Sequence, residues 1–326
     1  MIKPLSVLVC AAVLSTVAGV APAVAQNKPA AQNFGPDVEL QTTAKGPPGD
    51  RVVVVGKQIN EFIYWVGAQS QVVARDRTSE APPEILKKPS VGYHRALSAE
   101  GVISTNPSVF LTDANVGPPA VMEQLKKVGI PIKVMRVGDS MADSEHLMQE
   151  VGQYFGRTQQ ADAVIATWRK DMARALEASK LWANAPRPKV VLVHFGQAQN
   201  IFFGITGGPS NEIIQWAGGD NVLAGRKGAQ LTPELMADAQ PDIILAHQLA
   251  FSRFGSAKAF TQLPGVALTP AGKNLAIYEV NSTNTTYYSP RTPFAILQLA
   301  KIFHPDVFKA HPELDAMYDE FSRIKP

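Results

Sequence analysis

Short, fully apolar runs alternate with helical stretches along this chain from residue 51 onward. Val52–Val55 is followed at once by Gly56, a helical segment covers 60–67, and a second short apolar run covers 72–74. Continuous apolar runs of this length are typical of parallel strands that are buried on both faces. The pattern therefore predicts an α/β protein.

Two segments of the sequence occur twice and in the same order. Residues 60–67 (NEFIYWVG) match 211–218 (NEIIQWAG), and 97–100 (LSAE) match 231–234 (LTPE). A proline and then an apolar strand follow each of the shorter copies. One such match could arise by chance, but two in register predict that the halves of the chain are similar α/β lobes.

The two halves differ in the length of one connection. The repeated Asn and the repeated Leu lie 37 positions apart in the first half (97 − 60) and 20 apart in the second (231 − 211), so the first half carries 17 additional residues. Val91–Arg95 (VGYHR) lies within this addition. Function is often carried by such loops on a common scaffold, which makes this segment a candidate site.

A long helix is predicted between the halves. Residues 162–183 have helical periodicity without Gly or Pro, and a helix of about six turns would span roughly 30 Å as a rigid strut. A further apolar strand at 189–193 opens the second half. We therefore divide the chain into a signal peptide (1–25), a flexible leader (26–50), an N-terminal α/β lobe (51–157), a connecting helix (158–187) and a C-terminal α/β lobe (188–326).

The N-terminal segment has the parts of a cleaved secretory signal. Lys3 precedes a nearly unbroken apolar run at 5–20, and Ala23–Ala25 is an A-x-A cleavage pattern. The run is short for the alternative, a membrane anchor. The only cysteine, Cys10, lies inside this segment, so the mature chain is expected to have no disulfide. Export to a bacterial periplasm is the simplest interpretation.

The charge balance and the motif content exclude several classes of protein. The 31 Lys and Arg residues nearly balance the 28 Asp and Glu residues, and no basic block of five or more residues occurs, so nucleic-acid binding is not expected. The sequence lacks a G-x-S-x-G nucleophile elbow, a zinc motif and a dinucleotide-binding glycine turn. We therefore expect no enzymatic activity and no catalytic cofactor.

Two motifs carry a resemblance to a known family. Gly92–Gly101 reads GYHRALSAEG, and Pro290–Pro293 reads PRTP in a late loop. With the strand, the helix and the long connecting helix, they make the chain from Arg51 to about Pro305 resemble the periplasmic haem-binding proteins of bacterial haem ABC importers. Their shared signature is GYxRxLSAEG. The resemblance implies the class III (helical-backbone) fold of periplasmic binding proteins, with two Rossmann-like lobes joined by one long helix.

The resemblance also implies the ligand and the partners. The chain would bind haem b as a transported ligand in the cleft between its lobes. It would deliver the haem to an inner-membrane ABC permease with its ATPase subunits, and would meet the membrane only through that permease. We expect a monomer.

Tyr93 would be the axial ligand of the ferric haem iron, which tyrosinate is known to bind. A phenol has a pKa near 10, about three units above neutral pH. Ionising it at pH 7 therefore costs roughly 4 kcal/mol, which iron and a nearby cation must offset. On an extended segment residues i and i+2 share a side, so Arg95 is expected to help Tyr93 and His94 to point away. The alternative is a tyrosine that caps a lobe core beside a solvated arginine.

Further haem-site candidates lie in the second half. The resemblance places Arg291 near the metal or the propionates, for which a bidentate guanidinium is suited. Tyr287 and Tyr288 could wall the macrocycle, or could equally pack against a core. His194 ends the 189–193 strand, where ligands gather in open α/β sheets, and is a possible haem contact. The remaining histidines, among them His247 at the end of a strand, lack the spacing of a metal pair.

Glu100 and Glu234 stand at matched positions of the repeat, one in each lobe. In relatives of this architecture a glutamate on each lobe docks onto arginines of the permease, although an acid in a first helical turn is also favoured by the helix dipole alone. Three other functions remain open. They are a ferric-siderophore or cobalamin binding protein of the same fold, a secreted enzyme with a Tyr/His/Arg site, and a zinc or manganese carrier.

Overall fold

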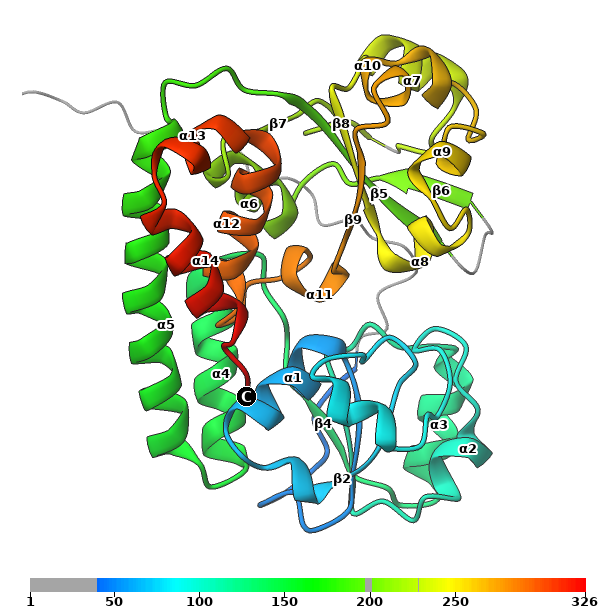
Figure 1. Cartoon of the computed structure of the whole chain (residues 1–326). Coiled ribbons are helices and arrows are strands. Elements are labelled where there is room, and N and C mark those ends of the chain that lie inside the picture. Colours follow the sequence, from blue (N-terminus) through cyan, green and yellow to red (C-terminus); the bar gives the residue numbers. More distant parts are fainter. Residues whose placement is uncertain (1–39, 197–200, 228) are drawn as a thin grey trace, which may run out of the picture.

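The computed structural model describes residues 40–196, 201–227 and 229–326. It forms two α/β lobes, and the helix α5 (Thr158–Ala178) runs along one side of both (Figure 1). The fold expected from the sequence is therefore confirmed. The proposed signal peptide at 1–25 and the leader up to residue 39 lie outside the described residues.

The first lobe is built on a parallel sheet with strand order β2-β1-β3-β4. Its strands and helices are β1 (Val52–Val55), α1 (Lys57–Trp65), β2 (Val72–Arg75), α2 (Ala99–Ile103), β3 (Val109–Thr112), α3 (Pro119–Lys127), β4 (Ile132–Val134) and α4 (Met141–Tyr154), with short 3-10 turns at Gln69–Gln71 and Pro83–Lys87. Alternate residues of β1 point to opposite faces. Val52 and Val54 meet α1, α4 and α5, whereas Val53 and Val55 meet α2 and α3.

The second lobe repeats this plan with strand order β6-β5-β8-β9. Its strands are β5 (Lys189–Gly196), β6 (Ile201–Gly204), β7 (Asp220–Asn221), β8 (Ile243–His247) and β9 (Ile277–Val280), of which β6 is antiparallel to β5 and β7 pairs in parallel with β5. Its helices are α6 (Pro209–Trp216), α7 (Pro233–Ala239), α8 (Gln248–Ser252), α9 (Ala257–Phe260), α10 (Pro270–Lys273) and α11 (Ser282–Thr285), with a 3-10 turn at Val266–Leu268. The C-terminal helices α12 (Thr292–Phe303), α13 (Pro305–Ala310) and α14 (Glu313–Ser322) complete it.

The sequence repeat corresponds to a structural repeat. The copies at 60–67 and 211–218 lie on α1 and α6, and the copies at 97–100 and 231–234 begin α2 and α7. Ser98 caps α2 by accepting a hydrogen bond from Gly101 N (3.3 Å), and Thr232 caps α7 by accepting from Leu235 N (3.2 Å). The central strand pairs β1–β3 and β5–β8 are both parallel and occupy the same place in their sheets.

The connecting helix is part of both hydrophobic cores. Its first half contributes Ala161 and Ile165 to the core of the first lobe, and Trp168, Met172 and Ala175 join the core of the second. Its 21 residues span about 31 Å at 1.5 Å per residue, and a 3-10 turn at Ser179–Trp182 follows. The strut is thereby fixed to each lobe by apolar packing.

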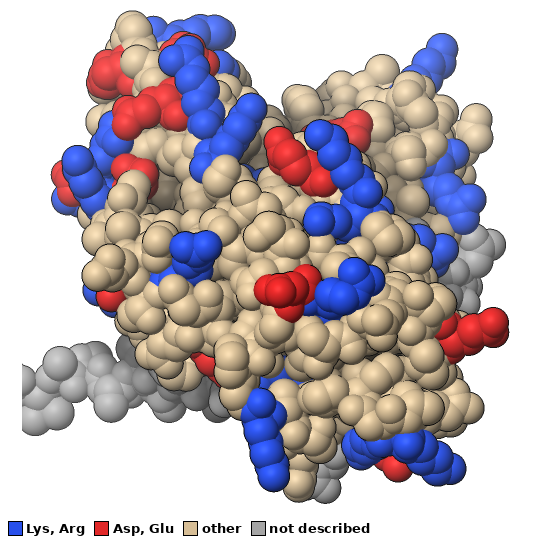
Figure 2. Space-filling model, turned by 90° about the horizontal axis from the view of Figure 1, so that it is seen from below, with Lys and Arg blue, Asp and Glu red and all other residues tan. Residues whose placement is uncertain are grey.

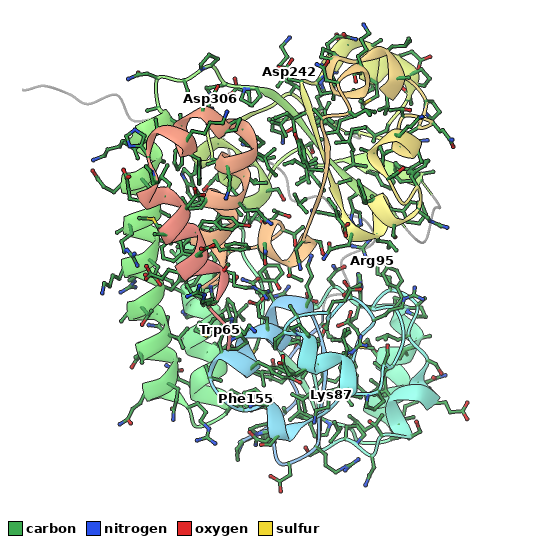
Figure 3. The ribbon with its side chains drawn as sticks, viewed as in Figure 1. Trp65, Lys87, Arg95, Phe155, Asp242 and Asp306 are labelled. Carbon is green, nitrogen blue, oxygen red and sulfur yellow. The ribbon has the colours of Figure 1, made fainter. Side chains whose placement is uncertain are left out.

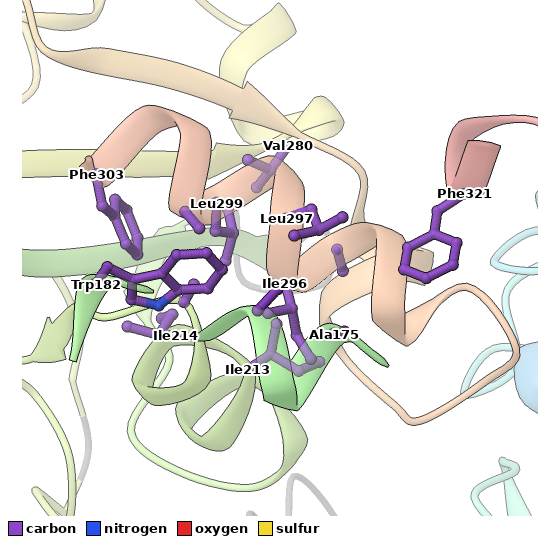
Figure 4. Close-up of a cluster of buried hydrophobic side chains, with 14 of the residues drawn as sticks. Ala175, Trp182, Ile213, Ile214, Val280, Ile296, Leu297, Leu299, Phe303 and Phe321 are labelled. Atoms are coloured by element: carbon purple, nitrogen blue, oxygen red, sulfur yellow. The ribbon is translucent and has the colours of Figure 1, made fainter. Parts of the chain in front are cut away.

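The largest core lies in the second lobe, where Trp182, Ile214 and Phe303 meet beside the sheet (Figure 4). Trp182 is nearly fully buried, and its indole nitrogen donates to the carbonyl of Trp216 (3.0 Å). A large side chain in such a position contributes several kcal/mol to the stability of the fold. Its truncation to alanine typically costs about 3–5 kcal/mol.

Residues 40–50 correct the expectation of a flexible leader up to residue 50. Leu40 is buried, and the backbone N–H groups of Thr43 and Ala44 donate to the carbonyl of Ile132 on the edge strand β4. The hydroxyl of Thr43 accepts from Ile132 N at 2.9 Å. An edge strand exposes unpaired backbone groups, and this segment satisfies some of them. Composition alone does not reveal such pairing.

Figure 2 shows acidic and basic side chains scattered over the face that it draws, with no extended area of one sign. None of the helices within the described ranges combines the length and the apolarity that a membrane crossing requires.

Candidate ligand-binding site

The carboxyl ends of the parallel strands in the two lobes supply most of the polar groups of the candidate site. Lys57 follows β1 and Asp113 follows β3 in the first lobe, while His194 lies near the end of β5 and His247 ends β8 in the second. Ligands of open α/β sheets bind at this edge. Lys57 connects the two sets, because its Nζ donates to Thr286 Oγ1 of the second lobe (2.6 Å). Desolvation lowers the pKa of both His194 and His247, and the charge of Lys57 adds to this.

Tyr93 stands on a turn and not on an extended segment. Ala96 N donates to Tyr93 O (2.8 Å), and Gly117 N donates to His94 O (2.9 Å). Gly92 enters the turn at φ 104°, a region that favours glycine. The prediction that His94 points away from Tyr93 is therefore wrong. The two rings lie side by side, with centroids 4.3 Å apart, because the turn brings i and i+1 to the same side.

The cation beside the Tyr93 ring is Arg77. Its guanidinium carbon lies 5.5 Å from the ring centroid. Arg95, expected in this role, is held by Asn115 through Nε and Nη2 at 3.0 and 2.7 Å from Oδ1. Figure 3 places Arg95 on the part of the first lobe nearest the second. Among the described residues nothing takes the Tyr93 hydroxyl as a hydrogen-bond partner.

His94 presents a neutral imidazole next to Tyr93. Burial lowers the pKa of His94 to about 4, and the charge of Asp76 opposes this only in part. Its Nδ1 is buried, and no partner for it exists within the described part of the chain. A buried polar atom without a partner is costly. A ligand or a water molecule at this point would satisfy it.

The floor of the first lobe is a desolvated charge cluster. Burial lowers the pKa of Lys57 to about 8, against the opposing charges of Asp76 and Asp113. Burial also raises the pKa of Asp113 to about 6, and the negative charge of Asp76 adds to this. Asp76 accepts from Gly56 N (3.2 Å) and Thr78 N (2.8 Å), which fixes it at the end of β2. The sequence motifs did not single out Lys57, Asp76 or Asp113.

His194 and His247 form a pair at the edge of the second lobe. Strands β5 and β8 are parallel with Val193 opposite Ala246, so the next residue of each strand is a histidine. The two Nδ1 atoms are 3.4 Å apart, and His247 Nε2 is 3.0 Å from Thr285 Oγ1. The sequence could have revealed this pair in one way, because each histidine directly follows an apolar run that was predicted to be a strand, at 189–193 and at 243–246.

Both imidazoles of the pair are neutral at pH 7. His247 is almost fully buried, and desolvation holds its pKa well below the usual value. His194 is solvent-exposed near the end of β5, and desolvation by the surrounding protein, followed by the charge of Lys57, lowers its pKa to about 4. Neutral imidazoles can act as metal ligands.

Arg291 and Tyr287 lie at the contact between the lobes. Arg291 Nη2 is 3.0 Å from Oε2 of Glu61, a fully buried carboxylate on α1. The Tyr287 hydroxyl donates to the same oxygen, and Trp65 Nε1 donates to Oε1 (3.0 Å). The haem-site role implied for Arg291 stays a prediction, and one of its guanidinium nitrogens already has a buried partner in the other lobe.

Tyr287 and Tyr288 correspond to the alternative in which they pack against a core. Tyr287 is 4% exposed and Tyr288 is 0% exposed, so neither ring offers a wall to a macrocycle. The hydroxyl of Tyr288 donates to Glu212 (2.6 Å), and its carbonyl accepts from Gln58 Nε2 of the first lobe (3.0 Å). The loop at 287–291 therefore joins the lobes.

Glu100 and Glu234 are both exposed in the first turn of their helices. The backbone N–H of Glu234 and the Thr232 hydroxyl lower the pKa of the Glu234 carboxyl, which keeps it charged. A largely apolar groove beside Glu100 is lined by Ala99, Ile103 and Val128 together with Gln124 and Lys127. The structure thus gives each lobe an exposed acid at an equivalent position.

Comparisons with known proteins agree with this architecture. A family model described as periplasmic binding protein matches residues 52–283. The chain is similar to the solved "Periplasmic heme-binding protein RhuT from Roseiflexus sp. RS-1 in apo form", with 27% identity, a TM-score of 0.71 and coverage of 79% of this chain and 99% of that one. A periplasmic heme binding protein from Pseudomonas aeruginosa is 25% identical with a TM-score of 0.65, over 78% of this chain and 93% of that one.

Sequence comparison also finds relatives that are named for a different ligand. The Vitamin B12-binding protein of Vibrio vulnificus (strain YJ016) is 23% identical over 269 residues, which cover 81% of this chain and 93% of that protein. That of Pectobacterium atrosepticum is 24% identical over 226 residues, which cover 68% and 80%. Haem and cobalamin thus both occur as ligands in the names of its relatives.

Proposed function

The chain belongs to the periplasmic binding protein family, and we propose that its ligand is haem, which it binds between the two lobes and delivers to an inner-membrane ABC permease. Members of this family are periplasmic substrate-binding components of transport systems. The choice of haem over cobalamin or a ferric siderophore is supported by one observation above all. The Tyr93 hydroxyl, on a turn held by backbone hydrogen bonds, is left without a partner among the described residues.

The surroundings of Tyr93 suit a ferric iron ligand. Phenolate is a hard oxygen donor, and ionising the phenol at neutral pH costs roughly 4 kcal/mol, which ferric iron and a nearby positive charge offset. Arg77 supplies that charge at the Tyr93 ring. Arg95, two residues from Tyr93, adds a second one held in place by Asn115. Cobalamin and a siderophore already enclose their metal and need no phenolate.

Three neutral imidazoles are candidates for further haem contacts. His94 lies against Tyr93 in the first lobe, and His194 and His247 lie in the second. His247 is buried, so His194 is the second-lobe candidate. We leave Arg291, Tyr287 and Tyr288 out of the proposed haem site because Arg291 Nη2 and the two tyrosine hydroxyls are engaged by Glu61 and Glu212, although Arg291 Nε has no partner among the described residues.

The test is titration of the purified mature protein with hemin, followed by its visible spectrum. We expect a sharpened Soret band with tyrosinate features that Tyr93→Phe loses. Tyr278→Phe, which changes an exposed tyrosine of β9, is the matched control and is expected to keep them. If Tyr93→Phe keeps the wild-type spectrum and affinity, Tyr93 is not the ligand. If hydroxocobalamin binds and hemin does not, the ligand is cobalamin.

We also propose that Glu100 and Glu234 dock onto the permease. Each is exposed on its own lobe at an equivalent place in the repeat, as a two-sided contact with a membrane partner requires. The double reversal Glu100→Arg, Glu234→Arg is expected to bind haem normally and to fail in haem uptake. Glu177→Arg, Asp306→Arg changes the charge equally at other exposed acids and serves as the control. Normal uptake by the first double variant would contradict the docking role.

A further inference from the structure

A continuous line of polar atoms runs from His194 into the second lobe. His194 Nδ1 lies 3.4 Å from His247 Nδ1, and His247 Nε2 lies 3.0 Å from Thr285 Oγ1. The Thr285 hydroxyl in turn lies 3.2 Å from the carbonyl oxygen of Asn281. His247 and Thr285 are each 1% exposed, so water does not compete for these hydrogen bonds.

The end of this line decides its direction, because a carbonyl oxygen accepts and never donates. When the Thr285 hydroxyl donates to Asn281 O, it accepts from His247 Nε2–H. A neutral imidazole carries one N–H, so His247 Nδ1 is then an acceptor and receives the Nδ1–H of His194. In this direction all three contacts are hydrogen bonds.

The opposite direction makes one hydrogen bond fewer. Thr285 has a single hydroxyl proton, and donating it to His247 Nε2 takes it from Asn281 O. His247 would then donate from Nδ1 to His194 Nδ1, and His194 would carry its proton on Nε2. In a buried environment the direction with three hydrogen bonds is favoured over the one with two. The lowered pKa values of both histidines agree with neutral rings throughout.

We propose that His247 and Thr285 are positioning residues that hold His194 in its Nδ1–H tautomer and thereby present the lone pair of its Nε2 to the ligand. Metal-binding histidines commonly donate their other ring N–H to an acceptor, which fixes the tautomer and raises the basicity of the ligating nitrogen. Within the described residues, His194 Nε2 has no hydrogen-bond partner. The part of the proposal that concerns haem rests on the proposed function, whereas the tautomer does not.

Neighbouring contacts hold the line in place. The backbone carbonyl of Thr285 accepts from Ser210 Oγ (2.5 Å), which ties α11 to α6. At the other end of α11, Ser282 N donates to Gln248 Oε1 of α8 (2.8 Å), the residue directly after His247. The positions of His247 and Thr285 are thus fixed by contacts within the second lobe, and Lys57 of the first lobe adds a hydrogen bond to the neighbouring Thr286.

The tautomers are measured directly in the ligand-free protein. Long-range ¹H–¹⁵N spectra of histidine-labelled protein report which ring nitrogen carries the proton. We expect Nδ1–H for His194 and Nε2–H for His247. In His247→Phe and in Thr285→Val we expect His194 to shift to Nε2–H, and Thr285→Ser, which keeps the hydroxyl, is expected to retain the wild-type tautomers. His311, half-buried near the C-terminus, is the internal control.

The proposal is overturned if wild-type His194 carries Nε2–H, or if neither His247→Phe nor Thr285→Val changes its tautomer. Because these spectra need no haem, they stand even if the protein binds another ligand.

Hemin titration then tests the consequence for the ligand. Loss of such a supporting partner typically weakens metal binding about 10- to 100-fold, and we expect this of His247→Phe and of His194→Ala. If His194→Ala weakens hemin binding and His247→Phe does not, the positioning role is wrong. If His194→Ala binds hemin as the wild type does, the presentation of Nε2 to haem is wrong. If the wild type does not bind hemin at all, the proposed function fails while the tautomer result stands.

Discussion

The buried ion pair between Arg291 and Glu61 is expected to stabilise the contact between the lobes and not to bind the ligand. The Glu61 side chain is 0% exposed, and Arg291, at 15%, is its charged partner. Removing one member of a buried pair typically costs about 3–5 kcal/mol, because the remaining charge stays desolvated. In Arg291→Met the Glu61 carboxylate keeps its hydrogen bonds from Tyr287 and Trp65. We therefore expect a loss at the lower end, about 3 kcal/mol.

A double-mutant cycle separates the pair from its surroundings. Glu61→Gln keeps one acceptor oxygen, which can serve Tyr287 or Trp65 but not both, because these two side chains donate to different oxygens of Glu61. It also leaves the Arg291 charge, at 15% exposure, partly in reach of water, so a smaller loss of stability than in Arg291→Met is expected. The double variant Glu61→Gln, Arg291→Met leaves no buried charge and should recover most of the stability lost in Arg291→Met. The measurement is urea unfolding followed by circular dichroism and tryptophan fluorescence, whose agreement tests two-state behaviour.

Arg174→Met is the matched control for Arg291→Met. Arg174 forms a bidentate pair with Glu320 (2.7 Å for both contacts) between α5 and α14 and a longer contact with Asp171 (3.3 Å). Its side chain is 33% exposed, against 15% for Arg291, and an ion pair that is open to solvent is worth about 1 kcal/mol or less. If Arg291→Met is no more destabilising than Arg174→Met, the argument from burial is refuted. If it also weakens hemin binding, Arg291 has the haem-site role that the resemblance implied.

Three further outcomes are expected from the structure. Burial raises the pKa of Asp113 to about 6 in the folded protein. Between about pH 4 and pH 6 the folded state therefore binds a proton that the unfolded state does not. The stabilisation that this proton gives is complete below pH 4 and is lost as the pH rises through 6. Asp113→Asn should therefore be more stable than the wild type at pH 7.5, by up to about 3 kcal/mol at 1.36 kcal/mol per pKa unit. In urea titrations this difference in the free energy of unfolding should vanish near pH 4. An equal difference at both pH values would contradict the prediction. Trp182→Ala should lose about 3–5 kcal/mol by thermal or urea unfolding, whereas its neighbour Leu181→Ala, at an exposed position, should change stability by less than about 0.5 kcal/mol; similar losses in both would refute the assigned packing. Thr43→Val removes the hydroxyl that accepts from Ile132 N, so hydrogen exchange of that amide should become faster at a cost of about 1 kcal/mol, and unchanged exchange would show that residues 40–50 do not cover β4.

The parts of the fold that the sequence predicted are those with a local physical signal. The four consecutive valines of β1 form a strand that is buried on both faces. Successive side chains of a strand point to opposite faces, so an unbroken apolar run is fully buried only when both faces of the sheet are covered. The uninterrupted helical pattern forms α5, although the helix begins at Thr158 and its last turn, at Ser179–Trp182, is 3-10. The repeat identified the two lobes because each copy performs the same packing task against its own sheet.

The candidate site was predicted only as far as a motif marks it. Tyr93 was proposed from its signature, and His194 from its place at the end of a strand. The assumption of an extended segment at Tyr93 failed because the conformation there is set by backbone hydrogen bonds to distant partners, such as the one from Gly117 N to His94 O. Nothing in five consecutive residues contains that information.

The sequence by itself thus determined the strands, the long helix, the two similar lobes and the motif that carries Tyr93. Only the tertiary structure decided which charges and rings meet. Arg77 at Tyr93, His247 at His194 and Glu61 at Arg291 are each contacts between residues that are distant along the chain. Their geometry follows from strand register and from the contact between the lobes, whereas hydrophobic periodicity reports only which side of an element is buried.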